Sequence, residues 1–181
     1  MNGALCKCDC IVCITLPRPI TVIELRDACC YSGAMSKHEE ADLILKLYDL
    51  RREQRMREAR TWFAREFNPQ TSADVNDTMF GPNGEYLRMV MSYWDMAAAL
   101  VNHGAISEEL FDETNTEHLM VYGKLEPLLG EMRAMYGPQV LLNLEKLFEN
   151  TKGLRERVAS WRERWNGVRA EMERRRAVPV S

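Results

Sequence analysis

The sequence has no cysteine after residue 30, and this absence divides the chain into two parts. All six cysteines lie in the first 30 of its 181 residues. A domain without cysteine has no disulfides and fits a reducing compartment. We therefore expect an irregular, cysteine-rich extension over residues 1–34, not necessarily part of the native folded protein. Residues 35–181 are expected to form a single helical domain with a basic C-terminal helix.

Long hydrophobic runs are also missing. No apolar stretch approaches the roughly 20 residues that span a bilayer. The apolar residues 11–16 are closed by Pro17-Arg18-Pro19 and are too short for a secretory signal. The hydrophobic fraction of 46% and the charged fraction of 28% are typical of a soluble globular protein. We expect a cytoplasmic location.

Motifs of catalysis and cofactor binding are absent as well. The three histidines are His38, His103 and His118, and none follows a glutamate by three residues as in di-iron bundles. Neither a glycine-rich phosphate loop nor a Gly-x-Ser-x-Gly motif occurs. The sequence leans against an enzyme without excluding one, and we expect no catalytic residue and no cofactor.

A metal site is not expected either. Cys6, Cys8, Cys10 and Cys13 are the weak candidates, since four thiolates could bind zinc or copper(I). Neighbouring ligands of structural zinc usually lie farther apart, and no second ligand pair follows. A Cys-rich tract is therefore only a compositional cue.

Helix signals occupy the rest of the chain. Ser36 and Glu39 form a capping box, and Asn68-Pro69 ends the helix that we expect over residues 36–67. Residues 86–101 form the most apolar helix, which ends at Gly104, and Ser107 caps the next one. The first helix is expected to bury one face, interrupted by Arg52, that comprises Ala41, Leu45, Tyr48, Met56, Ala59, Phe63 and Phe67.

The second half of the chain predicts further helices. Pro127 should kink one of them, and a last helix over residues 138–176 has weak points at 150–153 and 166–167. We predict an all-α fold: an antiparallel bundle of four to six helices, with long first and last helices.

The last helix carries an apolar seam beside a run of arginines. Residues 152–176 have nine Lys/Arg against four Glu, whereas residues 68–151 have four Lys/Arg against thirteen Asp/Glu. Arginine edges disfavour pairing of two copies of this helix and favour an acidic partner. The seam runs through Val140, Leu144, Leu147, Thr151, Leu154, Val158, Trp161, Trp165, Val168 and Met172. The acidic partner can be this chain's own bundle, which we favour, or another protein.

Two sets of residues are candidates for a site. The first is an interaction face on the last helix that comprises Arg155, Arg157, Trp161, Arg162, Arg164, Trp165 and Arg169. Its glutamates argue against nucleic acid, and a membrane surface is a less favoured alternative. The second is a ligand pocket lined by Tyr93, Asp95, His103 and Tyr122, in which Asp95 is a polar residue within an apolar helix.

Residues 93–110 combine an aromatic–acidic pair, an apolar run, a glycine turn and an Ile-Ser-Glu-Glu segment that starts the next helix. Over about residues 85–136 the chain resembles small uncharacterised bacterial helical proteins with a domain of unknown function, some of which have a preceding membrane helix that this chain lacks. The resemblance implies a helical fold and supplies no mechanism.

These observations lead to three hypotheses. The leading one is a non-enzymatic helical interaction or scaffold protein that presents the 154–172 face, or the charged middle of the first helix, to a protein with an acidic face. The first alternative is a small-molecule-binding or enzymatic domain with a pocket near Tyr93, Asp95 and Tyr122. The second is peripheral membrane attachment through the last helix. The oligomeric state is left open.

Overall fold

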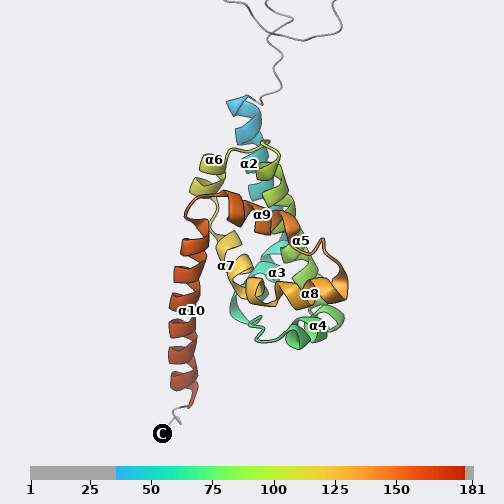
Figure 1. Ribbon diagram of the computed structural model, residues 1–181, viewed down its shortest axis with the longest axis vertical. Helices are drawn as coiled ribbons and strands as arrows, with labels where there is room; N and C mark the ends of the chain where they lie inside the picture. Colours follow the sequence, from blue (N-terminus) through green and yellow to red (C-terminus); the bar gives the residue numbers. More distant parts are fainter. Residues whose placement is uncertain (1–35, 178–181) are drawn as a thin grey trace, which may run out of the picture. The chain divides into compact units, whose positions relative to one another are not determined.

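The computed structural model describes residues 36–177, and over this range the chain is all-helical, without strands (Figure 1). The predicted all-α fold class is confirmed. The elements are α2 (Lys37–Arg52), α3 (Gln54–Arg65), α4 (Ser72–Phe80), α5 (Gly84–Asn102), α6 (Glu108–Thr114), α7 (Glu117–Leu125), the short 3-10 helix η2 (Glu126–Leu128), α8 (Leu129–Tyr136), α9 (Leu142–Asn150) and α10 (Leu154–Ala177). The four cysteines considered for a metal lie outside the described residues.

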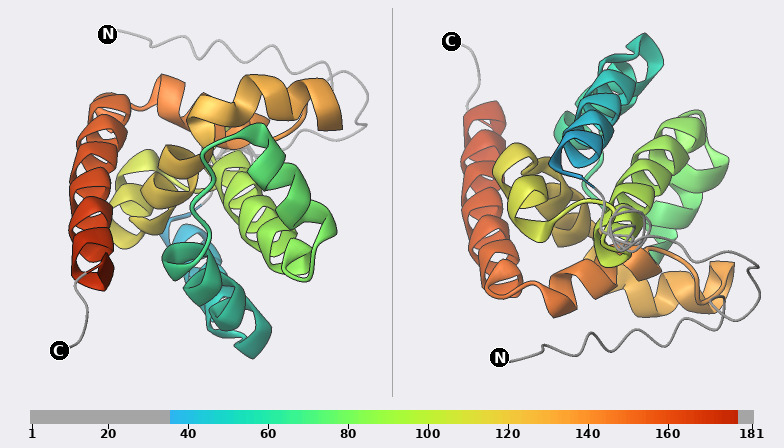
Figure 2. Two further views of the ribbon diagram at one scale, coloured as in Figure 1. Left: turned by 90° about the horizontal axis from the view of Figure 1, so that it is seen from below. Right: turned by 90° about the horizontal axis from the view of Figure 1, so that it is seen from above.

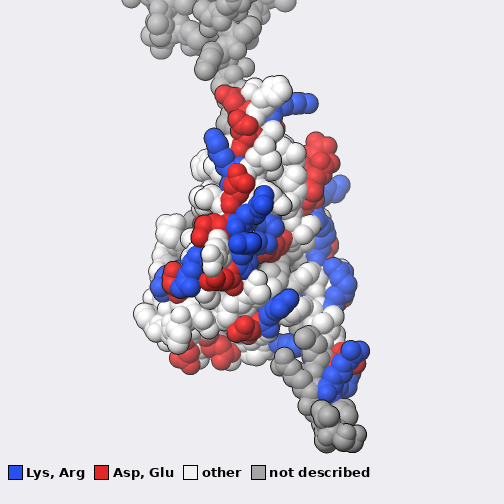
Figure 3. All heavy atoms as spheres, turned by 180° about the vertical axis from the view of Figure 1, so that it is seen from behind, with Lys and Arg blue, Asp and Glu red and all other residues white. Residues whose placement is uncertain are grey.

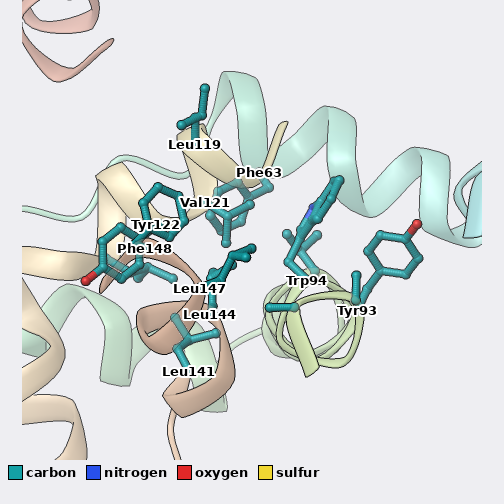
Figure 4. Close-up of a cluster of buried hydrophobic side chains, with 14 of the residues drawn as sticks. Phe63, Tyr93, Trp94, Leu119, Val121, Tyr122, Leu141, Leu144, Leu147 and Phe148 are labelled. Atoms are coloured by element: carbon teal, nitrogen blue, oxygen red, sulfur yellow. The ribbon is translucent and has the colours of Figure 1, made fainter. Parts of the chain in front are cut away.

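The central element is α5, which packs against α3 and α9 and also contacts α4 and α7. Its inward face is apolar at a helical period, so that Leu87, Val90 and Trp94 are fully buried. Figure 4 shows side chains of α3, α5, α7 and α9 meeting in this core. Burial of a large apolar side chain stabilises a fold by roughly 1.5–3 kcal/mol, so this shared core holds the bundle together.

The joint between α5 and α6 forms as its local signals predict. Gly104 has a positive φ of 72°, a left-handed conformation that suits glycine at a helix end. The Ser107 side chain accepts a hydrogen bond from the Leu110 N–H and caps α6. The flanking Ile106 and Phe111 are both buried, as expected for a hydrophobic staple.

The first helix is divided, in contrast to the continuous helix expected over residues 36–67. Glu53 is extended, with φ −54° and ψ 140°, and its carboxylate accepts a hydrogen bond from the Met56 N–H to start α3. The break changes the direction of the chain, so α2 and α3 do not share one buried face. Leu45 and Tyr48, which the sequence assigns to that face, are 61% and 52% exposed, and Leu47 is buried instead.

The C-terminal half also follows its local signals in part. Pro127 lies in η2, between α7 and α8, where the predicted kink occurs. The weak point at 150–153 is a break, because Gly153 has a φ of 80° and α10 starts after it. The second weak point, Asn166-Gly167, does not interrupt α10. Within residues 36–177, none of the helices combines the length and the apolar character needed to cross a bilayer.

Candidate functional site

Asp95, the polar residue of the predicted pocket, stabilises the start of a neighbouring helix. Its carboxylate accepts hydrogen bonds from the backbone N–H groups of Asn143 and Leu144 and from the Asn143 side-chain amide, each at 2.9 Å. These N–H groups belong to the first turn of α9 and have no partner within that helix. Asp95 is therefore committed to a structural role by the bonds that it makes.

The other pocket candidates do not come together around Asp95. Tyr93 donates its hydroxyl to the Leu47 carbonyl at 2.8 Å, whereas Tyr122 stacks on Phe148 with ring centroids 4.1 Å apart. Figure 4 shows the two tyrosine rings on opposite sides of the core. Burial raises the pKa of each tyrosine to about 12, so both hydroxyls stay protonated.

His103, the fourth candidate, is exposed at the C-terminal end of α5. The structure thus does not bring the four candidates together, because the sequence places them on α5, at its end and on α7 without fixing which way their side chains point.

The arginine-bordered seam of α10 faces the bundle. Leu154 and Val158 are buried, and Val168 is 50% exposed, so the contact weakens toward the end of the helix. Trp161 and Trp165 stack with centroids 5.8 Å apart and line a pocket of about 200 Å³ between α10, α7 and the 68–70 loop. The apolar seam is therefore used for internal packing, which is the interpretation that the charge pattern favours.

The arginines of α10 reinforce this packing. Arg157 pairs with Asp112, Arg155 with Glu126 and Glu149, and Arg162 with Glu126 and the Gly123 carbonyl. Arg169 donates to Gln70 at 3.3 Å. Arg164 is exposed, and no ion pair or hydrogen bond of its side chain is found in the described part of the chain. Of the seven residues of the predicted interaction face, Arg164 is thus the one most available to a partner.

Lys124 is a buried cation that the sequence analysis did not single out. Its ammonium donates to the carbonyls of Phe63, Ala64 and Phe67 at 2.7, 3.2 and 2.7 Å, at the C-terminal end of α3. Burial lowers the pKa of Lys124 to about 7. A neutral amine has only two N–H groups, so the three hydrogen bonds that Lys124 donates require the protonated ammonium. The C-terminal end of α3 also favours a positive charge, and both effects oppose the loss of the proton from Lys124.

A cluster of charged side chains joins α2, α3 and α7, and the sequence pattern did not predict it. Glu117 accepts hydrogen bonds from both Arg51 and Arg60, and the Arg60 Nε lies 2.9 Å from each of its carboxylate oxygens. Arg51 also donates to Asn115 and lies over the Trp94 ring, 5.5 Å from its centroid. One carboxylate thus serves two guanidiniums, and the cluster keeps a net positive charge.

A groove of about 440 Å³ runs beside this cluster. Arg57, Arg60 and Arg65 of α3 lie along it, and Ala64 and Met120 are its half-buried apolar lining residues. Within residues 36–177, the exposed side chains of Arg57 and Arg65 make no ion pair or hydrogen bond. We call this surface the basic groove. It combines free guanidiniums, one fixed guanidinium and an apolar floor.

The basic groove lies on one flank of a protruding helix. Figure 2 shows α3 standing out from the bundle, with α7 and α10 on one side and α4 and α5 on the other. A second open groove of about 690 Å³ lies on the α5 side, where Arg55 pairs with Glu58 and Glu85. In Figure 3, which shows the molecule from behind, Lys and Arg side chains near the middle of the view are interspersed with Asp and Glu side chains. Of the two flanks of α3, only the α7 flank is clearly basic.

The described residues do not hold a cluster of three or more His, Cys, Asp or Glu side chains that could bind a metal ion. Neither the comparison with curated proteins nor that with solved structures found a match. Residues 38–151 match the family model described as "Domain of unknown function (DUF4760)", a range that contains the basic groove and ends before α10. The family accords with the resemblance noted for residues 85–136 and assigns no activity. This chain belongs to the DUF4760 family.

Proposed function

We propose that this protein is a non-enzymatic interaction protein that binds an acidic segment of another protein in the basic groove. The observation that carries the proposal is the pair Arg57 and Arg65, two exposed guanidiniums that no carboxylate of the described chain neutralises. Both lie on α3, which has four arginines against one glutamate. This surface overlaps the charged middle of the first predicted helix, residues 51–60, which is one of the two surfaces favoured by the sequence, and extends beyond it to Arg65.

The arrangement of the arginines supports a carboxylate-rich ligand. Arg60 is held in place by Glu117 and by its own bond to the Arg51 carbonyl at 3.2 Å, so it loses little side-chain entropy on binding. Guanidiniums bind carboxylates through paired, charge-assisted hydrogen bonds. Glu117 carries one negative charge and is shared by two arginines, so it neutralises only one of them. The remaining positive charge attracts an incoming acidic group.

The lining of the basic groove supports a peptide segment over a bare anion. Met120 and Ala64 offer apolar contact between the charged rims, and methionine adapts to ligands of different shape. An acidic segment with an apolar side chain at every third or fourth position would match both features as a helix in a groove.

The test uses the full-length protein and labelled peptides rich in Glu, with Leu or Phe at helical spacing, followed by fluorescence anisotropy. Wild-type protein should bind these peptides, and more weakly as salt rises. The double variant Arg57→Glu/Arg65→Glu should lose affinity by roughly tenfold to a hundredfold, because two attractive contacts become repulsive.

The matched control is Lys152→Glu/Arg164→Glu, which changes the net charge equally at two exposed positions outside the basic groove. It should bind as the wild type does. Equal binding by wild type and by the Arg57/Arg65 double variant would refute the proposal. Loss of binding in the control alone would instead assign the interaction to α10.

We further propose a bacterial, cytoplasmic setting for this protein. The absence of cysteine after residue 30 supports a reducing compartment, and the pattern in residues 93–110 supports a bacterial origin. Fractionation of the source cells, with immunodetection of the native protein, tests the compartment.

A further inference from the structure

A small pocket lies between α10, α7 and the loop of residues 68–70, outside the basic groove. Figure 2 shows α10 beside α7, the helix with which it makes its main contact. The pocket has a volume of about 200 Å³, below the roughly 300–1,000 Å³ of pockets for drug-sized ligands, so it suits a ligand of about one ring. We call it the tryptophan pocket. Its charged and aromatic lining residues are Lys124, Trp161, Arg162, Trp165 and Arg169.

The charged side chains that line the tryptophan pocket are all cationic. Among its described lining residues, three are Lys or Arg and none is Asp or Glu. The ammonium of Lys124 donates only to backbone carbonyls, and Lys124 makes no ion pair within residues 36–177. A buried charge is usually paired with an opposite charge. The wall of the pocket therefore holds a positive charge that no carboxylate of the described chain neutralises, which favours an anionic ligand.

Arg162 supplies hydrogen-bond donors for such an anion. Its Nε donates to the Gly123 carbonyl at 3.1 Å and its Nη2 pairs with Glu126, so the guanidinium is held in place. Its Nη1 makes no hydrogen bond within the described residues and keeps both of its N–H groups. Glu126 also pairs with Arg155, so one carboxylate serves two guanidiniums. A fixed guanidinium with free N–H groups binds a carboxylate through charge-assisted hydrogen bonds.

Two tryptophans form an aromatic wall of the same pocket. The Trp161 and Trp165 rings are nearly parallel, with an interplanar angle of 10° and centroids 5.8 Å apart. The Lys124 ammonium lies 4.9 Å from the centroid of the Trp165 ring, so the aromatic wall and the buried charge adjoin. Pro69 and Leu128 add apolar surface. An aromatic ring packs on an indole by stacking or edge contacts, so a ligand that combines a ring with a negative charge would use both features.

We propose that the tryptophan pocket binds a small carboxylic acid with one aromatic ring. The ring packs against Trp161 and Trp165, and the carboxylate accepts hydrogen bonds from Nη1 of Arg162. The family match ends at residue 151, so the matched domain forms one wall of the pocket and α10 forms the other. A bound ligand therefore fastens α10 to the bundle. The tryptophan pocket shares no lining residue with the basic groove, so either proposal can fail without the other.

The probe is benzoate, titrated into the full-length protein by isothermal titration calorimetry, with a reducing agent because of the six cysteines. Binding should be saturable at one site. Cyclohexanecarboxylate, which lacks the aromatic ring, should bind roughly threefold to tenfold more weakly, and benzyl alcohol, which lacks the charge, roughly tenfold or more. Inorganic phosphate tests the charge alone and should also bind more weakly. Absence of benzoate binding overturns the proposal, and so does any of the three other compounds binding as tightly as benzoate.

Matched variants test the two cations. Lys124→Met keeps the length of the side chain without its charge, and Arg162→Gln removes the guanidinium. Each should weaken benzoate binding by roughly tenfold or more. The controls Lys152→Met and Arg164→Gln, at exposed positions outside the pocket, should bind as wild type does. Circular dichroism checks the fold, and if Lys124→Met does not fold, Arg162→Gln decides. Wild-type affinity in either folded pocket variant contradicts the proposed site.

Limited proteolysis gives a readout on the wild type itself. Because benzoate would bind only when α10 is in place, a saturating concentration should slow trypsin cleavage at the arginines of α10. Arg162→Gln is the control: its cleavage should not respond, which also shows that benzoate does not inhibit trypsin. An unchanged rate of wild-type cleavage would rule out a ligand between α10 and the bundle.

Discussion

Asp95 shows at the residue scale how a side chain can attract attention as a site and yet be structural. The sequence identifies it correctly as a polar group within an apolar helix. Its partners, Asn143 and Leu144, lie 48 and 49 residues away, and no local signal connects them to it. Leu141, just before α9, has a positive φ of 50°, and α9 has no capping side chain of its own N-cap residue. The cap comes from α5 instead.

We predict that Asp95→Ala lowers the free energy of unfolding by about 1–3 kcal/mol, because it leaves two backbone N–H groups of α9 without a partner. Urea unfolding followed by circular dichroism measures the loss. Asp77→Ala, at an exposed position of α4, is the control and should change stability by less than about 0.5 kcal/mol. Unchanged stability of Asp95→Ala would contradict the capping role.

His118 is a second structural residue whose environment has a measurable consequence. It is 1% exposed, lies among the rings of Trp94, Phe111 and Phe148, and its Nδ1 is buried without a hydrogen-bond partner. Burial lowers its pKa from 6.5 to about 4. Between pH 6.5 and 4 the imidazole is thus neutral in the folded protein, whereas the unfolded chain would take up a proton.

We predict a loss of stability as pH falls from 6.5 to 4. Over this range the unfolded chain binds a proton at His118 and the folded chain does not, so the free energy of unfolding falls by up to roughly 3 kcal/mol. Above pH 6.5 both states are neutral and this contribution to the pH dependence disappears. His118→Phe, measured by urea unfolding at several pH values, should flatten the dependence, whereas His103→Gln at the exposed end of α5 should not. A His118→Phe protein with the wild-type pH dependence would refute this assignment.

At the element scale, the contact between α7 and α10 depends on a residue without a side chain. A Cβ atom on Gly123 would lie 2.6 Å from Cε3 and 2.7 Å from Cζ3 of Trp161. These ring atoms are part of a large indole, and they can move away only if Trp161 or α10 shifts. Gly123 is therefore what allows the tryptophan seam to pack closely on α7.

We predict that Gly123→Ala loosens α10, with a loss of roughly 1–3 kcal/mol from overpacking. Trypsin should then cleave sooner at the arginines of α10, as followed by mass spectrometry. Gly130→Ala in α8 is the matched control, because nothing lies within 4 Å of its added Cβ atom. That variant should be neutral or slightly stabilising, since alanine is the better helix former. Equal cleavage rates in the two variants would contradict the role of Gly123.

The elements also show which parts of the fold a sequence reveals. Helix ends at Ser36, Gly104 and Ser107 were predictable because a cap is a local interaction over three or four residues. The break at Glu53 was not, since neither glycine nor proline marks it and the apolar positions resume on the same face at Met56, with Arg52 as the single interruption. The apolar pattern, when it is taken as one continuous helix, therefore assigned Leu45 and Tyr48 to the core. In the structure, α2 packs with Leu47 buried instead.

At the scale of the whole molecule, charge segregation was informative only in part. It predicted that the basic last helix finds acidic partners within the bundle, as the pairs of Arg155, Arg157 and Arg162 confirm. It did not reveal the basic groove, because Arg60 and Glu117 are 57 residues apart in sequence. The family match ends at residue 151, before α10, so the groove belongs to the matched domain while the arginine-bordered helix follows it.

The buried ammonium of Lys124 can report on the opening of the folded chain, because it is protected from chemical modification. An amine reacts with acylating reagents through its lone pair, and an ammonium that donates to three carbonyls has none to offer. The side chain is also only 8% exposed, and it is packed between the end of α3 and Trp165 of α10, so a reagent reaches it only when this packing opens. The rate at which Lys124 is acylated, compared with that of exposed Lys152, therefore reports how often the packing around Lys124 opens in the native protein.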